Sequence, residues 1–153
     1  MTARTHTKTV DYADAVLKLR RCLRRAVRTG LPGPALTASE TELLALVART
    51  QGIGVAEAAD SLQVAPNTVS TLVGRLSQEG LLHRRRDHRD RRAARLGLTP
   101  AGEARIAEVR RRRAAILDDA FDRLSAEDRA LLLDSLPALE HLVDALAGEV
   151  DAP

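Results

Sequence analysis

Apolar side chains in the first fifty residues recur at the spacing of one helical face. Near the N-terminus they step by four, three, four and three residues, at Tyr12, Val16, Leu19, Leu23 and Ala26. This pattern predicts a first helix over residues 9–28, which the glycines and prolines of residues 30–34 would end. Thr37, followed by Glu40, resembles a capping box and predicts the start of a second helix. The residues of that helix expected to face a core are Leu43, Leu46 and Val47.

Two further helices joined by a tight turn are predicted next. A short helix covers residues 56–62, residues 63–65 form the turn, and Pro66 suits the first position of the following helix, where its missing N–H costs nothing. Gly80 would end that helix. Its apolar side chains should face inward, namely Val69, Leu72, Val73 and Leu76. The same rotation turns an almost uncharged polar face outward, made of Asn67, Ser70, Thr71, Gly74, Arg75 and Gln78.

The segment after Gly80 predicts a basic β-hairpin. Residues 81–86 and 93–98 can form short strands around the turn-rich residues 87–92. Residues 75–95 contain eight arginines against three acids, a local charge of +5, whereas the rest of the chain has a net charge of −2. These arginines are Arg75, Arg84, Arg85, Arg86, Arg89, Arg91, Arg92 and Arg95. The excess positive charge therefore lies on the hairpin and the helix before it.

Two long helical patterns follow the hairpin. Thr99-Pro100 predicts an N-cap and first helical position, with a helix reaching about residue 124. Ser125 starts a last helix, for which Gly148 marks the expected end and in which Pro137 should cause a kink or a split. The apolar stripe of that helix is Leu132, Leu136, Leu139, Val143 and Leu146.

Length and composition place the chain among single globular domains. It has 153 residues, of which 44% are hydrophobic and 29% are charged, unlike a disordered or a membrane protein. The longest apolar runs are far shorter than the roughly 18 residues of a spanning helix. Residues 1–10 lack the apolar stretch of a secretory signal, and Cys22 is the only cysteine, so we expect a cytoplasmic protein without an internal disulfide.

Two helices joined by a tight turn and followed by a basic hairpin are the parts of a winged helix-turn-helix. The major groove of B-DNA admits one helix, whose short polar side chains can reach base edges. An arginine at the hairpin tip can enter the adjacent minor groove. We therefore expect one mainly α-helical domain over residues 1–153, with a winged helix-turn-helix lobe and a small two-stranded wing over residues 37–99.

Three segments form the predicted helix-turn-helix, namely Val55–Val64, Asn67–Leu76 and Glu79–Leu82. The hairpin tip reads Asp87-x-Arg89-Asp90-x-Arg92 and is followed by Leu98-Thr-Pro-Ala-Gly102. In these motifs the sequence resembles the MarR family of transcriptional regulators. The resemblance implies a ligand-responsive repressor that binds a pseudo-palindromic operator in double-stranded DNA as a homodimer. One departure is Ala65 at the N-cap of the recognition helix, where the family often has serine, so a cap of about 1 kcal/mol is missing.

The resemblance also implies roles for individual residues. The recognition helix would meet DNA through Asn67, Thr68, Ser70, Thr71 and Arg75. The wing would bind DNA through Arg84, Arg86, Arg89, Arg91 and Arg92, with Arg89 in the minor groove, and would be ordered by Asp87 and Asp90. Dimerisation would use the helices of residues 1–36 and 100–153, through Tyr12, Val16, Leu19, Leu23, Leu132, Leu136, Leu139, Val143 and Leu146. A monomer of this length would struggle to cover these stripes, which supports a dimer independently.

The alternative function is a winged-helix interaction module that binds an acidic partner protein through the arginine hairpin. The uncharged outer face of the recognition helix favours this alternative, and the intact wing argues against it.

Cys22 in the first predicted helix is expected to pack as a small apolar residue. The alternative is that its thiol senses oxidants.

Other chemistry is not expected. The four histidines and Cys22 have no metal-ligand spacing, and no nucleophile elbow or phosphate loop is present, so we expect no cofactor and no enzyme. A small-molecule effector would bind between the dimerisation helices and the winged lobe, in an aliphatic pocket with arginine at its edges.

Overall fold

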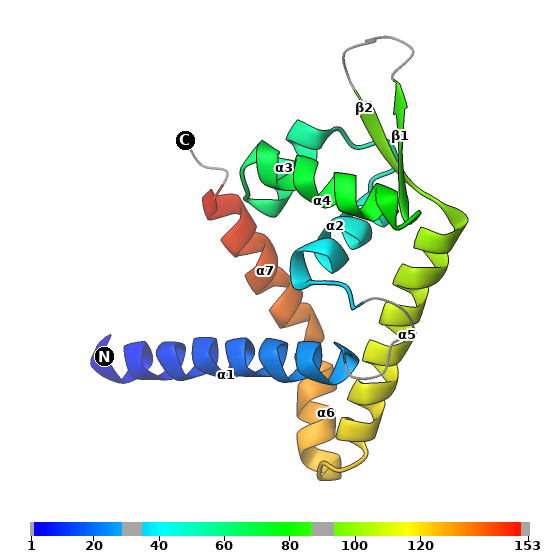
Figure 1. The fold of residues 1–153 in the computed structure, drawn as a ribbon. Coiled ribbons are helices and arrows are strands. Elements are labelled where there is room, and N and C mark those ends of the chain that lie inside the picture. The colour runs from blue at the N-terminus through cyan, green and yellow to red at the C-terminus, as the bar shows by residue number, and fades with distance from the viewer. Residues whose placement is uncertain (1, 29–34, 87–93, 151–153) are drawn as a thin grey trace. The chain divides into compact units, whose positions relative to one another are not determined.

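A computed structural model describes residues 2–28, 35–86 and 94–150 of the chain (Figure 1). These residues form helices and one two-stranded antiparallel sheet, so the mainly α-helical fold with a small wing is confirmed. The elements are α1 (Thr2–Arg28), α2 (Ala38–Arg49), α3 (Val55–Leu62), α4 (Pro66–Gln78), β1 (Leu82–Arg86), β2 (Ala94–Leu98), α5 (Pro100–Phe121), α6 (Ala126–Asp134) and α7 (Leu136–Val150). The chain divides into two compact units, residues 1–116 and 117–153.

Local sequence signals start the helices of the first unit as predicted. The Thr37 hydroxyl accepts the Glu40 N–H at 3.2 Å, and a Glu40 carboxylate oxygen accepts the Thr37 N–H at 2.7 Å, which completes the capping box of α2. Pro66 occupies the first position of α4. The Thr99 hydroxyl accepts the Gly102 N–H at 3.0 Å and caps α5.

Helix α1 is longer than the apolar pattern predicts. It begins at Thr2 and not at residue 9. Residues 2–8 are polar apart from Ala3, so no apolar stripe marks them as helical. Within the described ranges, no helix combines the length and the apolar character needed to cross a membrane.

After the end of α5, the second unit contains two helices in place of the single helix predicted from residue 125. Helix α6 ends at Asp134 and α7 starts at Leu136, with Pro137 in its first turn, so the predicted split at this proline is confirmed. Gly148 does not end α7, which continues to Val150, and this part of the prediction is wrong. A glycine inside a helix costs only about 0.5–1 kcal/mol and therefore does not stop it.

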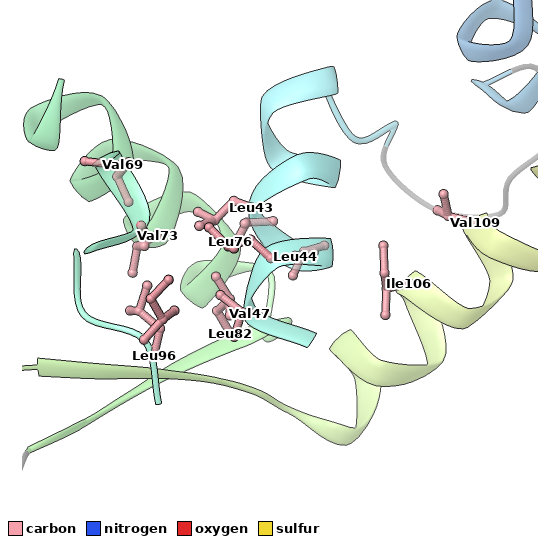
Figure 2. Packing of buried hydrophobic residues seen from close by; sticks show 14 of the residues in the cluster. Leu43, Leu44, Val47, Val69, Val73, Leu76, Leu82, Leu96, Ile106 and Val109 are labelled. Atoms are coloured by element: carbon pink, nitrogen blue, oxygen red, sulfur yellow. The ribbon is translucent and has the colours of Figure 1, made fainter. Parts of the chain in front are cut away.

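The core of the first unit joins α2, α4, both strands and the start of α5 (Figure 2). Its fully buried side chains include the predicted Val69, Val73 and Leu76 of α4, whereas Leu72 is only partly buried. The other labelled members are Leu43, Leu44, Val47, Leu82, Leu96, Ile106 and Val109. Burial of one valine or leucine contributes about 1.5–3 kcal/mol, so the three buried residues of α4 fix its rotation.

Gly102 allows the wing and α5 to approach closely. A Cβ atom added at Gly102 would lie 2.0 Å from the carbonyl oxygen of Leu81. That oxygen also accepts the Thr99 N–H at 3.1 Å, so the backbone cannot move away without losing a hydrogen bond. A side chain at position 102 would therefore separate the start of α5 from the start of the wing.

We predict that Gly102→Ala lowers the free energy of unfolding by about 1–3 kcal/mol, as overpacking in a close contact does. Urea denaturation at a fixed protein concentration measures this change. Gly74→Ala is the matched control, because a Cβ there meets no atom within 4 Å and alanine favours a helix. A loss below 0.5 kcal/mol at position 102 would contradict the close approach.

Candidate nucleic-acid interface

The polar face of α4 is exposed along its length. Burial of the apolar stripe turns the predicted DNA-contacting residues of this helix to the surface: Asn67, Thr68, Ser70, Thr71 and Arg75 are all exposed. Arg75 is the only charged residue of the helix. The face thus consists of short hydroxyl and amide groups with one long cation near its C-terminal end.

The N-terminal part of this face is partly ordered by its own hydrogen bonds. The Thr71 hydroxyl donates to the Asn67 carbonyl at 3.0 Å, and the Thr68 hydroxyl lies 3.5 Å from the Asn67 amide oxygen. A hydroxyl that donates its proton keeps lone pairs for a donor from outside. The Thr71 oxygen is therefore available as an acceptor, and the Asn67 amide as both donor and acceptor.

Arg75 is held by two glutamates from different elements. Its Nε atom lies 3.0 Å from a carboxylate oxygen of Glu40 on α2 and 3.3 Å from one of Glu79 at the end of α4. Sequence analysis identified Glu40 only as a capping residue and missed its ion pair with the recognition helix. Nothing in the local sequence indicates this contact, because 35 positions separate the two residues.

The wing is attached to the helix-turn-helix through β2. Leu96 exchanges backbone hydrogen bonds with the loop before α3, donating to Ile53 at 2.9 Å and accepting from Gly52 at 3.2 Å. An Nη group of Arg95 donates to the Gly52 carbonyl at 3.1 Å and to Glu57 at 3.2 Å. Arg95 therefore anchors the wing, a role that sequence analysis did not assign to it.

The described wing arginines differ in position. Arg84 is exposed on β1, and its Nη2 group lies 3.4 Å from the Ser70 carbonyl of α4, a long hydrogen bond that links strand and recognition helix. Arg86 ends β1. The remaining predicted wing residues lie outside the described residues, and their roles stay predictions: Asp87, Arg89, Asp90, Arg91 and Arg92.

A pocket of about 580 Å³ lies on the first unit between α2, the wing strands and the start of α5. Apolar side chains, among them Leu96, Leu98 and Ile106, form part of its wall. Its basic residues are His83, Arg85, Arg95 and Arg110, and Glu103 is its only acid. This composition suits a small anion with an apolar body.

Most residues predicted for dimerisation are exposed in the single chain. In the first unit Tyr12, Val16 and Leu19 of α1 are exposed, whereas Leu23 packs partly against the core. In the second unit the whole predicted stripe is exposed, namely Leu132, Leu136, Leu139, Val143 and Leu146. Cys22 is exposed as well, so the expected apolar packing of its thiol is not found in the chain.

Comparison with known proteins finds a family that this lobe resembles. Residues 36–94 match the model of the MarR family. In these residues the chain is similar to the MarR family. No group of three or more potential metal-ligating side chains occurs among the residues that the structure describes.

Two curated Bacillus subtilis proteins are similar to part of this chain. The chain is 33% identical over 87 residues to the uncharacterized HTH-type transcriptional regulator YsmB, covering 57% of this chain and 60% of that protein. It is 30% identical over 93 residues to the HTH-type transcriptional repressor MdtR, covering 61% and 60%. The match thus spans about 60% of the length of each relative. Both are named as regulators, which points away from an enzyme.

Solved structures extend the likeness over nearly the whole chain. A MarR family protein from Bacillus stearothermophilus is 26% identical with a TM-score of 0.74, covering 94% of this chain and 99% of that one. FabT from Streptococcus pneumoniae, solved in complex with DNA, is 20% identical with a TM-score of 0.73, covering 92% and 99%. The second likeness concerns the fold alone.

Helix α4 lacks a side-chain cap at its N-terminus. Ala65 has the extended backbone of an N-cap, with φ −64° and ψ 143°, but its side chain cannot accept a hydrogen bond. We predict that Ala65→Ser raises the free energy of unfolding by about 1 kcal/mol, because the hydroxyl can accept the Thr68 N–H. Thermal or urea denaturation measures the gain.

Ala101→Ser is the control for this substitution. Ala101 is exposed in the first turn of α5, which Thr99 already caps, so its replacement should change stability by less than about 0.5 kcal/mol. Equal effects of the two substitutions would argue against a missing cap at position 65.

Proposed function

We propose that this protein is a homodimeric transcriptional regulator that binds specific double-stranded DNA and represses transcription until a small ligand releases it. The observation that carries the proposal is the exposed polar face of α4 beside the basic wing, on a helix whose apolar stripe is buried. The names of the curated relatives and the DNA complex of a protein with the same fold support it.

Each part of the lobe has a distinct place on DNA. Helix α4 enters the major groove, where Asn67 can bind an adenine edge through its amide and Thr71 can contact a base through its hydroxyl. The wing follows the flanking backbone, and Arg89 at its tip enters the minor groove. Narrow A·T tracts concentrate negative potential there, so the wing senses groove shape as well as charge.

The exposed apolar helices support the homodimer. Rows of leucine and valine on α1, α6 and α7 would leave large apolar areas in water in a single chain. A second copy can cover them by a two-fold interface in which each surface meets its own counterpart. Two lobes in one assembly then bind two half-sites about one helical turn apart.

The pocket between α2, the wing and α5 supports control by an anionic ligand. Arg95 lines this pocket and also donates to Gly52 before α3 and to Glu57 on α3. A ligand anion would compete with Glu57 for this guanidinium and loosen the attachment of the wing. Such a ligand binds more tightly to the state in which the wing is loosened. By linkage, it weakens DNA binding by the same factor by which DNA weakens binding of the ligand.

Selection of bound sequences from random duplex DNA tests the proposed function. We expect the full chain to enrich a two-fold element whose half-sites are centred about 10 base pairs apart. Binding should weaken steeply with salt, because arginines displace counterions from the phosphates. Recovery of only unrelated sequences would contradict the proposal and favour an interaction module with an acidic protein partner.

The minor-groove role of Arg89 has its own test. We predict that Arg89→Ala weakens binding to the selected element roughly tenfold and removes the preference for A·T-rich flanks. Fluorescence anisotropy with operators that differ only in their flanks measures both effects. Arg113→Ala removes the same charge from an exposed position on α5 and should leave the flank preference intact. An unchanged flank preference in the Arg89 variant would assign the minor groove to another residue.

A further inference from the structure

We infer that Arg75 recognises a guanine in the major groove and that Glu40 and Glu79 orient its guanidinium for this contact. The inference rests on the proposed DNA binding. It adds which base Arg75 recognises and which residues hold Arg75 in position. Two ion pairs join Arg75 of α4 to Glu40 on α2 and to Glu79 at the C-terminal end of α4.

Glu40 is the only buried charged side chain among the described residues, with 1% of its side chain exposed. Its two carboxylate oxygens have different tasks. Oε2 accepts the Thr37 N–H at 2.7 Å and completes the cap of α2. Oε1 is buried and accepts no hydrogen bond, and its charge partner is Arg75 at 3.0 Å. A buried carboxylate without a counter-charge is strongly unfavourable, so this oxygen holds the guanidinium in place.

Arg75 presents its other end to solvent. About half of its side chain is exposed, and its Nε–H donates to Glu79 at 3.3 Å. In the part of the chain that the structure describes, its two Nη groups make no further hydrogen bond or ion pair. Because a guanidinium is planar, fixing the Nε side directs the two Nη groups outward as a fork.

The fork suits a guanine better than a phosphate. Guanine offers two acceptors, O6 and N7, side by side in the major groove, whereas adenine offers one acceptor and one donor. A phosphate next to Arg75 would also approach the carboxylates of Glu40 and Glu79, and this repulsion offsets its attraction to the single cation. The neutral edge of a base avoids most of that repulsion.

The two glutamates also reduce the cost of binding. A free arginine side chain loses much rotamer freedom when it docks on a base, whereas a side chain already held by two carboxylates loses less. Glu40 contributes more to this order than Glu79, because its side chain is almost fully buried and that of Glu79 is 24% exposed. We therefore assign Glu40 as the main positioning residue.

Base preference at each position of the selected element tests this assignment. We expect the wild-type chain to favour guanine at one position of each half-site by about 5- to 150-fold, the range of a good bidentate contact. Arg75→Ala should abolish the preference there and leave the other positions unchanged. Arg75→Lys keeps the positive charge beside Glu40 but lacks the fork, so it should remain folded and also lose the preference.

Glu40→Gln tests the positioning role. Glutamine can still accept the Thr37 N–H with its single amide oxygen, but then it has no oxygen left for Arg75. We expect a folded protein whose guanine preference is lowered several-fold, with a smaller loss in Glu79→Gln. Glu42→Gln is the matched control, because Glu42 is an exposed residue of the same helix and pairs with Arg20 instead. It should leave every preference unchanged.

The outcomes separate this inference from the proposed function. If the wild-type chain selects no element, the proposed function fails. If it selects one but Arg75→Ala lowers affinity equally for all bases, Arg75 is a phosphate contact or a structural residue, and the inference is overturned. A guanine preference that survives in Glu40→Gln overturns the positioning role. Should Glu40→Gln not fold, Arg75→Lys still decides whether the fork of Arg75 recognises guanine, and Glu79→Gln decides whether a carboxylate beside it positions the guanidinium.

Discussion

The burial of one side of α4 determines most of what this molecule can do. Val69, Val73 and Leu76 pack against α2 and the strands, and their loss from the core would cost several kcal/mol. The helix therefore cannot rotate without exposing them. Because its opposite face follows from the same rotation, the short polar side chains of α4 and its single arginine stay in solvent. A helix fixed in this way presents one constant chemical pattern to a groove.

Two ion pairs, one with a buried carboxylate and one exposed, connect elements of the lobe. Glu40 joins the start of α2 to Arg75 of α4, and Arg95 joins β2 to Glu57 of α3. Exposed ion pairs contribute little to stability, so the value of the Arg95 pair lies in orientation. The first pair fixes a side chain on the recognition face, and the second fixes the strand that leads away from the wing tip. The first pair therefore acts on the exposed face of α4, and the second acts on the position of the wing relative to α3.

Local sequence patterns predicted most of the fold, because caps, prolines and apolar spacing act within a few residues. Thr37, Pro66 and Thr99 start helices where they were expected, and the proline at position 137 divides the last helix. The start of α1 at Thr2 was not predicted, because its first residues carry no apolar pattern. In the candidate site, rotation predicted the exposed residues of α4, but the partners of Arg75 and Arg95 could not be predicted. Those contacts join positions far apart in the sequence, and only tertiary packing brings them together.

Hydrogen exchange of the full chain with and without a duplex carrying the selected element tests the central claim most directly. The account predicts slower exchange at the amides of α4 and the wing strands on binding, with the unbound α4 already protected by its buried stripe. Protection confined to α6 and α7, or an α4 that exchanges as freely as an unfolded segment before binding, would contradict it.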